Sequence, residues 1–360
     1  MKLNKNINKN YFFILFMFVS IFIPIDGISA VLDFELQPII TPIDSPTLPS
    51  RGFFMGTLAN AASGQQLEDA YNQVAQYAEF VPIWGKPSAF YVLADDLAGW
   101  WGDIYVNQFV RAKGMFPLFN LSFFDDTTSY LKLIVPPNLS TTTTLSDPAW
   151  RQAYKQAAID VLNVARPKYF SLGNEVNRWY EQYGSSGTPN SFEHFVSLYN
   201  EIYDEIKVIS SQTVVYCIFA REIQNEYREA KLDFLKMFDP NKLDMLVFTS
   251  YPFSVQGTTS TYKIPSNYYV KISSYIDITG KPFGFSELCW WTHPFFGGEQ
   301  GQSDFINDVS TRLTRDQGLN LHLFGWCWLH DINSSDVTGL IKFDGTEKLG
   351  YQTWKTLSGK

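Results

Sequence analysis

The sequence predicts an α/β protein whose single domain is a (β/α)8 TIM barrel, and three observations support this prediction. Past Arg51, short apolar runs alternate with longer segments of helical spacing, and there are eight such runs. Strands that are apolar along their whole length are typical of a parallel sheet buried on both faces. No Gly-rich turn follows the first run, which disfavours the alternative, a doubly wound open sheet with a nucleotide or phosphate site.

The eight predicted strands are the apolar or β-branched runs themselves. In chain order they cover residues 53–58, 79–84, 115–124, 168–175, 213–220, 243–253, 282–290 and 321–329. Eight strand–helix units match the barrel, which typically needs ~250 residues plus insertions.

Two segments between the strands show a clear helical pattern. Residues 147–166 begin with Asp147 as the predicted N-cap and Pro148 at the first helical position, an arrangement typical of a helix start. Apolar residues then recur three or four positions apart, and residues 190–210 repeat this spacing. We expect both helices to cover the barrel.

The first fifty residues predict a processed and extended N-terminal region. Residues 1–30 carry lysines at positions 2, 5 and 9, an apolar run over 11–24, and small residues up to Ala30. This order is typical of a secretory signal peptide, and the run is short for a membrane span. We therefore expect a secreted protein cleaved near Ala30 without stable membrane insertion; the alternative is an uncleaved anchor. Residues 31–50 read as a proline-rich linker, followed by the barrel over 51–360.

Composition narrows the class of ligand. Hydrophobic residues make up 45% of the chain, charged residues 18% and aromatic residues 17%; the aromatic excess predicts rings that line a cleft. The net charge of −8 without any basic stretch excludes a nucleic-acid partner. The acidic net charge favours a neutral substrate. The four histidines show no metal-ligand spacing, so we expect no metal. We also expect no cofactor and a monomeric protein.

The three cysteines, Cys217, Cys289 and Cys327, lie within apolar runs. An odd number makes no complete disulfide framework. We expect buried free thiols; the alternative is a bridge between Cys289 and Cys327.

Polar residues at the carboxyl ends of the predicted strands are the candidate site, because a barrel's active site forms there. They are Asn120, Asn174, Glu175, Arg221, Tyr251, Glu287 and residues 328–331. Glu175 and Glu287 end strands four and seven, which face each other across the mouth of a closed barrel. A protonated and an ionised carboxyl group that converge on a neutral sugar perform glycoside hydrolysis, with retention at a separation of ~5–5.5 Å and inversion at ~6.5–9.5 Å.

Three motifs at these strand ends carry a family resemblance. They are "SLGNEVN" over 171–177, "FSELCW" over 285–290 and "GWCWLHD" over 325–331. Over about residues 51–357 the chain resembles the clan A glycoside hydrolases, which are retaining (β/α)8 enzymes. The resemblance implies that Asn174 contacts the sugar 2-OH, Glu175 is the acid/base and Glu287 the nucleophile. It also implies that Tyr251 lies near the nucleophile and that Trp328 lies under the cleaved sugar.

Within the clan, "SLGNEVN" and the chain length are most similar to the arabinogalactan endo-β-1,4-galactanase group (glycosyl hydrolase family 53) and its relatives. This implies an enzyme that cleaves internal β-linkages of a polysaccharide or oligosaccharide, with β-1,4-galactan as the first expectation and β-mannan as the second. Trp84, Trp290 and Trp291 are further candidates for sugar stacking. The sequence departs from the clan at strand two, where the frequent arginine has no counterpart and only Trp84 and Lys86 are near.

Structural alternatives exist for each candidate. Glu175 could be a solvated glutamate paired with Arg178, Glu287 a buried structural acid, Asn174 a loop cap, and Tyr251 an anchor of its strand end. Arg221, Glu222 and Glu226 fit best as a solvated loop and helix start. At the level of the whole protein, the alternatives are a non-catalytic carbohydrate-binding barrel and a transglycosylase.

Overall fold

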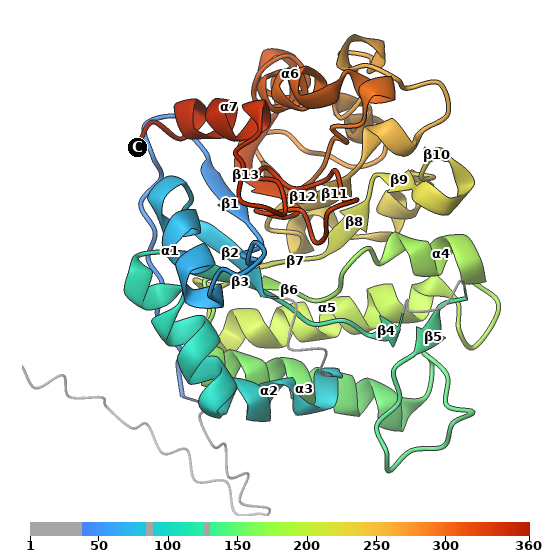
Figure 1. The fold of residues 1–360 in the computed structure, drawn as a ribbon. Helices are drawn as coiled ribbons and strands as arrows, with labels where there is room; N and C mark the ends of the chain where they lie inside the picture. Colours follow the sequence, from blue (N-terminus) through green and yellow to red (C-terminus); the bar gives the residue numbers. More distant parts are fainter. Residues whose placement is uncertain (1–37, 84–88, 126–129) are drawn as a thin grey trace, which may run out of the picture. The chain divides into compact units, whose positions relative to one another are not determined.

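The computed structural model describes residues 38–83, 89–125 and 130–360. Its centre is a sheet of nine strands whose neighbours all pair in parallel (Figure 1). They are β1 (Phe54–Thr57), β2 (Phe80–Ile83), β3 (Phe116–Asn120), β6 (Tyr169–Ser171), β7 (Val214–Tyr216), β8 (Ile218–Ala220), β11 (Leu246–Ser250), β12 (Pro282–Leu288) and β13 (Asn320–Trp326). The predicted signal peptide and Trp84 lie outside the described residues.

The sheet closes on itself through one interrupted strand. Its order is β7-β6-β3-β2-β1-β13-β12-β11-β8, and its two end strands are consecutive in the chain, separated by Cys217 alone. β7 pairs with β6 and β8 pairs with β11. The run predicted over 213–220 therefore supplies both end strands. The fold is the predicted (β/α)8 barrel, and all eight predicted runs contain its strands.

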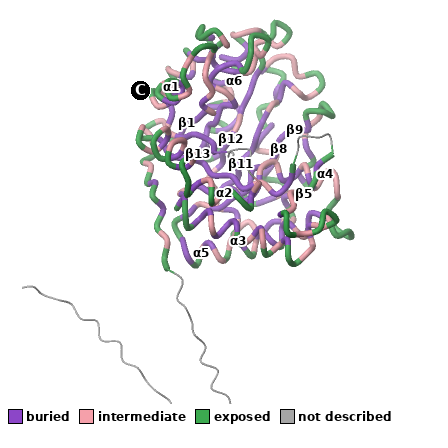
Figure 2. Tube along the Cα trace, turned by 60° about the horizontal axis from the view of Figure 1, so that its bottom comes forward, coloured by how far each residue is buried: buried purple, intermediate pink, exposed green. Residues whose placement is uncertain are grey.

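The barrel encloses its own packed layer. Phe54, Phe80, Phe116, Leu118, Tyr169, Tyr216, Ile218, Met245, Val247 and Leu323 form one buried cluster. Alternate positions such as Met55, Val81 and Phe248 belong to a larger cluster between strands and helices. Side chains on a strand alternate between faces, so the strands are buried on both faces, as the purple strands of Figure 2 show. The apolar cluster therefore fills the barrel interior, and the polar candidate residues lie beyond it, at the carboxyl ends of the strands.

The α-helices are α1 (Leu67–Tyr77), α2 (Phe90–Ala98), α3 (Pro148–Ala165), α4 (Asn177–Tyr183), α5 (Phe192–Ile209), α6 (Gly298–Ser310) and α7 (Leu349–Ser358). α3 starts as predicted, because the Asp147 side chain accepts a hydrogen bond from the amide of Ala149. α5 also matches its predicted segment, and both helices bury their apolar residues against the barrel.

Two of the eight strand–helix units lack an α-helix, which corrects the expectation that a helix follows every strand. After β8, residues 221–245 form a hairpin of β9 (Glu222–Ile223) and β10 (Arg228–Glu229), followed by short 3-10 turns. After β11, residues 251–281 again form only 3-10 turns. These segments are interrupted by prolines and, in the second, by Gly257 and serines and threonines, which break helices or favour turns. A second small hairpin joins β4 (Phe124–Asp125) and β5 (Lys132–Leu133).

The described part of the predicted linker, residues 38–50, packs on the barrel domain. Ile40 donates a backbone hydrogen bond to Ile209, and Asp44 forms an ion pair with Arg111. This stretch therefore belongs to the compact unit that runs from Pro38 to Lys360. Within the described residues no helix has the length and apolarity to cross a membrane.

Candidate active site

The loop after β6 holds Glu175 in a defined position. Gly173 has a φ of +155°, and a Cβ there would lie 2.3 Å from Cγ1 of Val176, so only glycine fits. The Asn177 side chain then exchanges two hydrogen bonds with the backbone of Ala220, at 2.7 and 2.9 Å, which ties the loop to β8. Between these anchors Glu175 adopts a φ of +47°. Left-handed backbone costs a non-glycine residue about 1–3 kcal/mol and is concentrated at functional sites.

Glu175 reaches across the barrel mouth to β11. Its Oε1 accepts a hydrogen bond of 2.6 Å from the hydroxyl of Thr249, and its Oε2 accepts one of 2.8 Å from Arg178. Thr249 is the register partner of Ala220 on β8, whose methyl group leaves the path open. The pairing with Arg178 that the structural alternative predicts is present, but the carboxylate is 15% exposed and directed into the mouth rather than solvated.

Glu287 lies on β12 beside Thr249. The two residues are register partners, after a bulge that shifts the pairing of β11 and β12 at Thr249. On the other side of β12, Gly325 lies so close that a Cβ would be 2.2 Å from the carbonyl oxygen of Ser286. Partners in adjacent strands point to the same face. Because Thr249 contacts Glu175 and adjoins Glu287, the structure brings both glutamates to the same side of the mouth.

Tyr251 connects Glu287 to a buried carboxyl group. The Tyr251 hydroxyl donates a hydrogen bond to Oε2 of Glu287, while its backbone amide donates one of 2.6 Å to Glu222. Burial, followed by the charges of neighbouring groups that include both site glutamates, raises the pKa of Tyr251 well above its ordinary value of 10. Tyr251 therefore stays protonated and remains a donor to Glu287 near neutral pH.

Glu222 is a structural support for this arrangement. Besides the amide of Tyr251, it accepts hydrogen bonds from the hydroxyls of Ser250 and Tyr268, at 2.9 and 2.8 Å. Burial raises its pKa from 4.5 to about 7, although the charge of Arg221 and the hydrogen bonds oppose this. Its side chain thus fixes the end of β11.

The structure corrects the prediction that Arg221 and Glu222 belong to a solvated loop and helix start. Arg221 is fully buried, and Glu222 is 3% exposed. Arg221 donates to Glu229 at 2.6 Å and stacks 4.0 Å from the centre of the Tyr268 ring. The reason is that Tyr268, from the segment after β11, contacts both side chains, and Glu229 of β10 pairs with Arg221. Of the three residues predicted to be solvated, Glu226 on the hairpin turn is the exposed one.

Both predicted site asparagines, Asn174 and Asn120, carry a side-chain carbonyl oxygen that has no hydrogen-bond donor within the described residues. Asn174 adjoins Glu175, is partly exposed, and has a buried Oδ1 of this kind. Asn120, at the end of β3, is 6% exposed and lines a small cavity of about 10 Å³ in the barrel interior with Tyr216 and Ser286. Asn174 thus lies directly before Glu175 in the loop after β6, whereas Asn120 faces the small interior cavity.

The predicted tryptophans occupy different environments. Trp328, just after β13, is partly exposed and packs against the core. Trp290 is fully buried, and its indole N–H donates to the carbonyl of Phe296 at 2.9 Å; the prediction that it contacts sugar is therefore corrected to a core role. Trp291, its neighbour, is 39% exposed. Trp84 lies outside the described residues.

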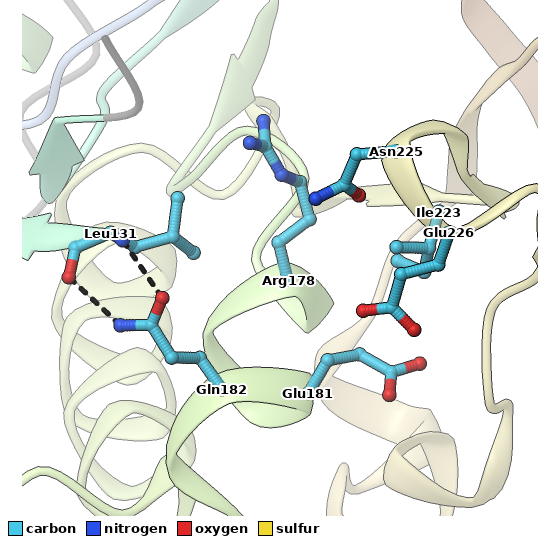
Figure 3. A pocket seen from close by; sticks show the side chains of 7 residues that line it. All are labelled: Leu131, Arg178, Glu181, Gln182, Ile223, Asn225 and Glu226. Atoms are coloured by element: carbon cyan, nitrogen blue, oxygen red, sulfur yellow. Dashed lines mark hydrogen bonds between the residues drawn. The ribbon is translucent and has the colours of Figure 1, made fainter. Parts of the chain in front are cut away.

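A charged pocket of about 170 Å³ lies next to Arg178. Figure 3 shows Arg178, Glu181 and Gln182 projecting from α4, with Asn225 and Glu226 opposite them on the β9–β10 turn. Glu181 and Glu226 both pair with Arg228, so the pocket's acidic groups already have protein partners. Within the described ranges no group of three or more His, Cys, Asp or Glu side chains is arranged to hold a metal ion.

Cys217, Cys289 and Cys327 are buried free thiols, as predicted. Cys289 and Cys327 both lie 3.8 Å from the carbonyl oxygen of Thr338.

Sequence reasoning missed Thr249 and Asn177 as residues of the site, and it placed Glu222 in a solvated loop instead of the site. Thr249 stands inside a predicted strand, two positions before Tyr251, so the alternation of side chains was a usable signal. Glu222 and Asn177 follow strand ends, but their partners become apparent only when the barrel is closed.

Comparisons with known proteins agree with the fold. No protein-family model and no curated protein matches the sequence. Among solved structures, the chain is similar to the exo-beta-1,4-mannosidase Op5Man5 from Opitutaceae bacterium strain TAV5, with a TM-score of 0.59, 15% identity, and coverage of 87% of this chain and 62% of that one. The chain is also similar to a GH5_18 variant from Bifidobacterium longum subsp. longum ATCC 55813 in complex with Manb1-4GlcNAc. The TM-score is 0.59 at 13% identity, with coverage of 85% of this chain and 78% of that one.

A family 39 glycoside hydrolase from the gut symbiont Bacteroides cellulosilyticus WH2 gives a TM-score of 0.57 at 12% identity, with coverage of 87% of this chain and 65% of that one. The chain thus spans less than two thirds of the first and third of these proteins. At such identities the likeness shows a shared barrel fold.

Proposed function

We propose that the protein is a retaining glycoside hydrolase that uses Glu175 and Glu287. One observation carries the proposal: at the carboxyl ends of the barrel strands, Thr249 donates a hydrogen bond to Glu175 and is the register neighbour of Glu287, so two carboxylates that are far apart in the sequence both adjoin one residue. The similar solved structures described as glycoside hydrolases support the same reaction class. The motif resemblance to clan A supports the division of roles.

In the proposed mechanism, Glu287 attacks the anomeric carbon while Glu175 gives its proton to the departing glycosidic oxygen. A covalent glycosyl-enzyme forms and the leaving group departs as an alcohol. Glu175, now ionised, removes a proton from water, and the resulting hydroxyl displaces Glu287 and releases the sugar with net retention. Tyr251, which donates to Glu287, orients the nucleophile.

Other residues have proposed binding roles. Asn174, whose buried Oδ1 has no donor within the described residues, is proposed to contact the sugar beside the cleaved bond, and Trp328 is proposed to lie under that sugar. Asn120, predicted to bind substrate, is proposed to do so from the deeper wall of the site, where its Oδ1 has no donor within the described residues. Export through the N-terminal signal peptide and the monomeric state remain part of the proposal.

Two substrate classes are proposed. The motifs resemble those of the endo-β-1,4-galactanase group, which supports cleavage of internal linkages in β-1,4-galactan. The similar structures include an exo-beta-1,4-mannosidase and a complex with Manb1-4GlcNAc, which supports β-mannosyl linkages. Both substrates are neutral, in keeping with the acidic net charge of the protein.

The test is an assay of new reducing ends on galactan, mannan, xylan and glucans with the wild-type protein, Glu287→Ala and Glu175→Gln. We expect wild-type turnover on one substrate, none by Glu287→Ala, and a loss of ~10²–10⁴-fold by Glu175→Gln that is smaller on substrates with very good leaving groups. Native rates in either variant would refute the assignment. Binding without new reducing ends would indicate a non-catalytic barrel, and products longer than the substrate a transglycosylase.

A further inference from the structure

A second pocket opens beside the candidate active site and differs from the charged one. It has a volume of about 570 Å³, within the ~300–1,000 Å³ typical of small-molecule sites. Three loops line it: the β9–β10 turn, the segment 253–259 after β11, and the segment 291–296 after β12. These loops follow the carboxyl ends of their strands, so the pocket opens on the same face of the barrel as Glu175 and Glu287.

The pocket adjoins the site through one residue of its wall, Phe253. The ring of Phe253, in its wall, lies 6.3 Å from the ring of Tyr251, which donates to Glu287. Phe253 also packs 4.6 Å from the ring of Trp291, four residues after Glu287. A ligand bonded to a sugar at Glu287 therefore has the pocket within reach.

The chemistry of the wall selects for uncharged groups. Among the residues that the structure describes, five aromatic residues line the pocket and no lining side chain carries a charge, although the wall also includes the exposed residues Gln224, Asn225 and Gln256. The aromatic members are Tyr227, Phe253, Trp291, Phe295 and Phe296. Flat rings bind the apolar face of another ring, whereas an ionised ligand would find no partner for its charge here.

The Trp291 ring has a rigid support. The ring centre of Phe253 lies 6.3 Å from that of the buried Trp290, and the Trp290 indole N–H donates a hydrogen bond to the carbonyl oxygen of Phe296. Phe296 in turn lies edge-on to Trp291, at 5.8 Å. Trp290 is thus a positioning residue for Trp291.

We propose that this pocket binds the leaving-group side of the substrate, and that it takes an uncharged group with a flat, apolar face, such as an aryl aglycone or a neutral pyranose ring. The inference rests on the proposed function. The pocket lies over the loops of β8, β11 and β12. It adjoins β11, whose Thr249 donates a hydrogen bond to the proposed acid/base Glu175, while Trp328, proposed for the cleaved sugar, follows β13. Asn225 links it to the pocket beside Arg178.

The test compares kcat/KM of the wild type and Trp291→Ala on three substrates of one sugar: a β-linked trisaccharide, an aryl β-glycoside and the glycosyl fluoride. Fluoride leaves without filling the pocket. We expect Trp291→Ala to lose about 10- to 100-fold on the first two and less than twofold on the fluoride. A loss confined to the aryl glycoside assigns the pocket to an aglycone, and one confined to the trisaccharide assigns it to a sugar.

Phe295→Ala, at a ring that is 64% exposed, is the second pocket variant, and Trp100→Ala, at an equally exposed tryptophan outside the pocket, is the control. Equal losses on all three substrates, or no loss on any, would overturn the proposal. Calorimetric titration of Glu287→Ala with the aryl glycoside tests the pocket separately from the proposed hydrolase function. Binding that Trp291→Ala weakens supports the pocket even if no polysaccharide is cleaved, and unaltered binding overturns it.

Discussion

Thr249 donates a hydrogen bond of 2.6 Å to Glu175, which lies 74 positions earlier in the chain. In the closed barrel, the interrupted strand made of β7 and β8 lies between β6 and β11. The hydrogen bond crosses it beside Ala220 of β8, the register partner of Thr249; the Ala220 side chain is only a methyl group. Since Thr249 is also the register partner of Glu287, one hydroxyl holds the proposed acid/base against the strand that adjoins the proposed nucleophile. The geometry of the two carboxylates thus depends on a residue that takes no part in bond making.

Thr249→Val tests this dependence. The substitution preserves shape and removes the hydrogen bond, and bonds to charged groups contribute about 1.5–3 kcal/mol. We expect kcat/KM to fall about 10- to 100-fold on glycosides whose leaving oxygen needs a proton, and to change little on a glycosyl fluoride. Thr142→Val, at an exposed loop threonine, is the matched control. A uniform loss on both substrate types would mean that Thr249 does not act through Glu175.

Tyr251→Phe makes a contrasting prediction. Because the Tyr251 hydroxyl donates to Glu287, its removal leaves the nucleophile without one orienting donor in every reaction. We expect kcat/KM to fall about 10- to 100-fold on the fluoride as well as on the natural glycoside. The control is Tyr262→Phe, at a tyrosine that is 80% exposed. If the fluoride were spared, the assignment of Glu287 as nucleophile would lose its support from Tyr251.

Glu222→Gln predicts a change in the pH dependence of stability. Burial raises the pKa of Glu222 from 4.5 to about 7 in the folded protein. Below pH 4.5 both states hold the proton; as pH rises toward 7 the unfolded state releases it first, so the wild type loses stability, by roughly 3 kcal/mol in all. Glutamine does not titrate. Urea unfolding of both proteins from pH 4 to 8 measures the difference.

The expected result is that the wild type becomes less stable relative to Glu222→Gln as pH rises, with the change complete just above pH 7. The opposite slope would mean that Arg221, which is fully buried next to Glu222, holds the carboxyl group ionised in the folded state.

Much of the barrel could be predicted because its strands are local patterns. Each run is apolar on both faces, and the Asp147–Pro148 start of α3 is legible in the sequence. The missing helices after β8 and β11 could not be predicted from the barrel rule alone, because they depend on whether each segment favours turns. Likewise, the break at Cys217 within the fifth run depends on where β6 ends.

The candidate site was predictable in part for the same reason. Glu175 and Glu287 stand out because each ends an apolar run. Thr249 and Glu222 act through register, and the bulge at Ser286 that sets this register has no local signature. Trp290 and Trp291 are adjacent in sequence, yet one is buried and the other exposed, a distinction that only the packing of Phe253 and Phe296 decides.

The left-handed backbone of Glu175 makes a prediction about stability alone. Its φ of +47° costs any residue with a Cβ, so Glu175→Gly is expected to be more stable than Glu175→Ala by about 0.5–1 kcal/mol, although both lose activity. At Arg166, with a φ of +46°, the glycine variant should likewise be more stable than the alanine variant. At Glu201, exposed within α5, the alanine variant should be the more stable one, by about 1 kcal/mol. Urea unfolding measures each pair, and if Glu175 followed the helical order instead, its backbone would not be strained.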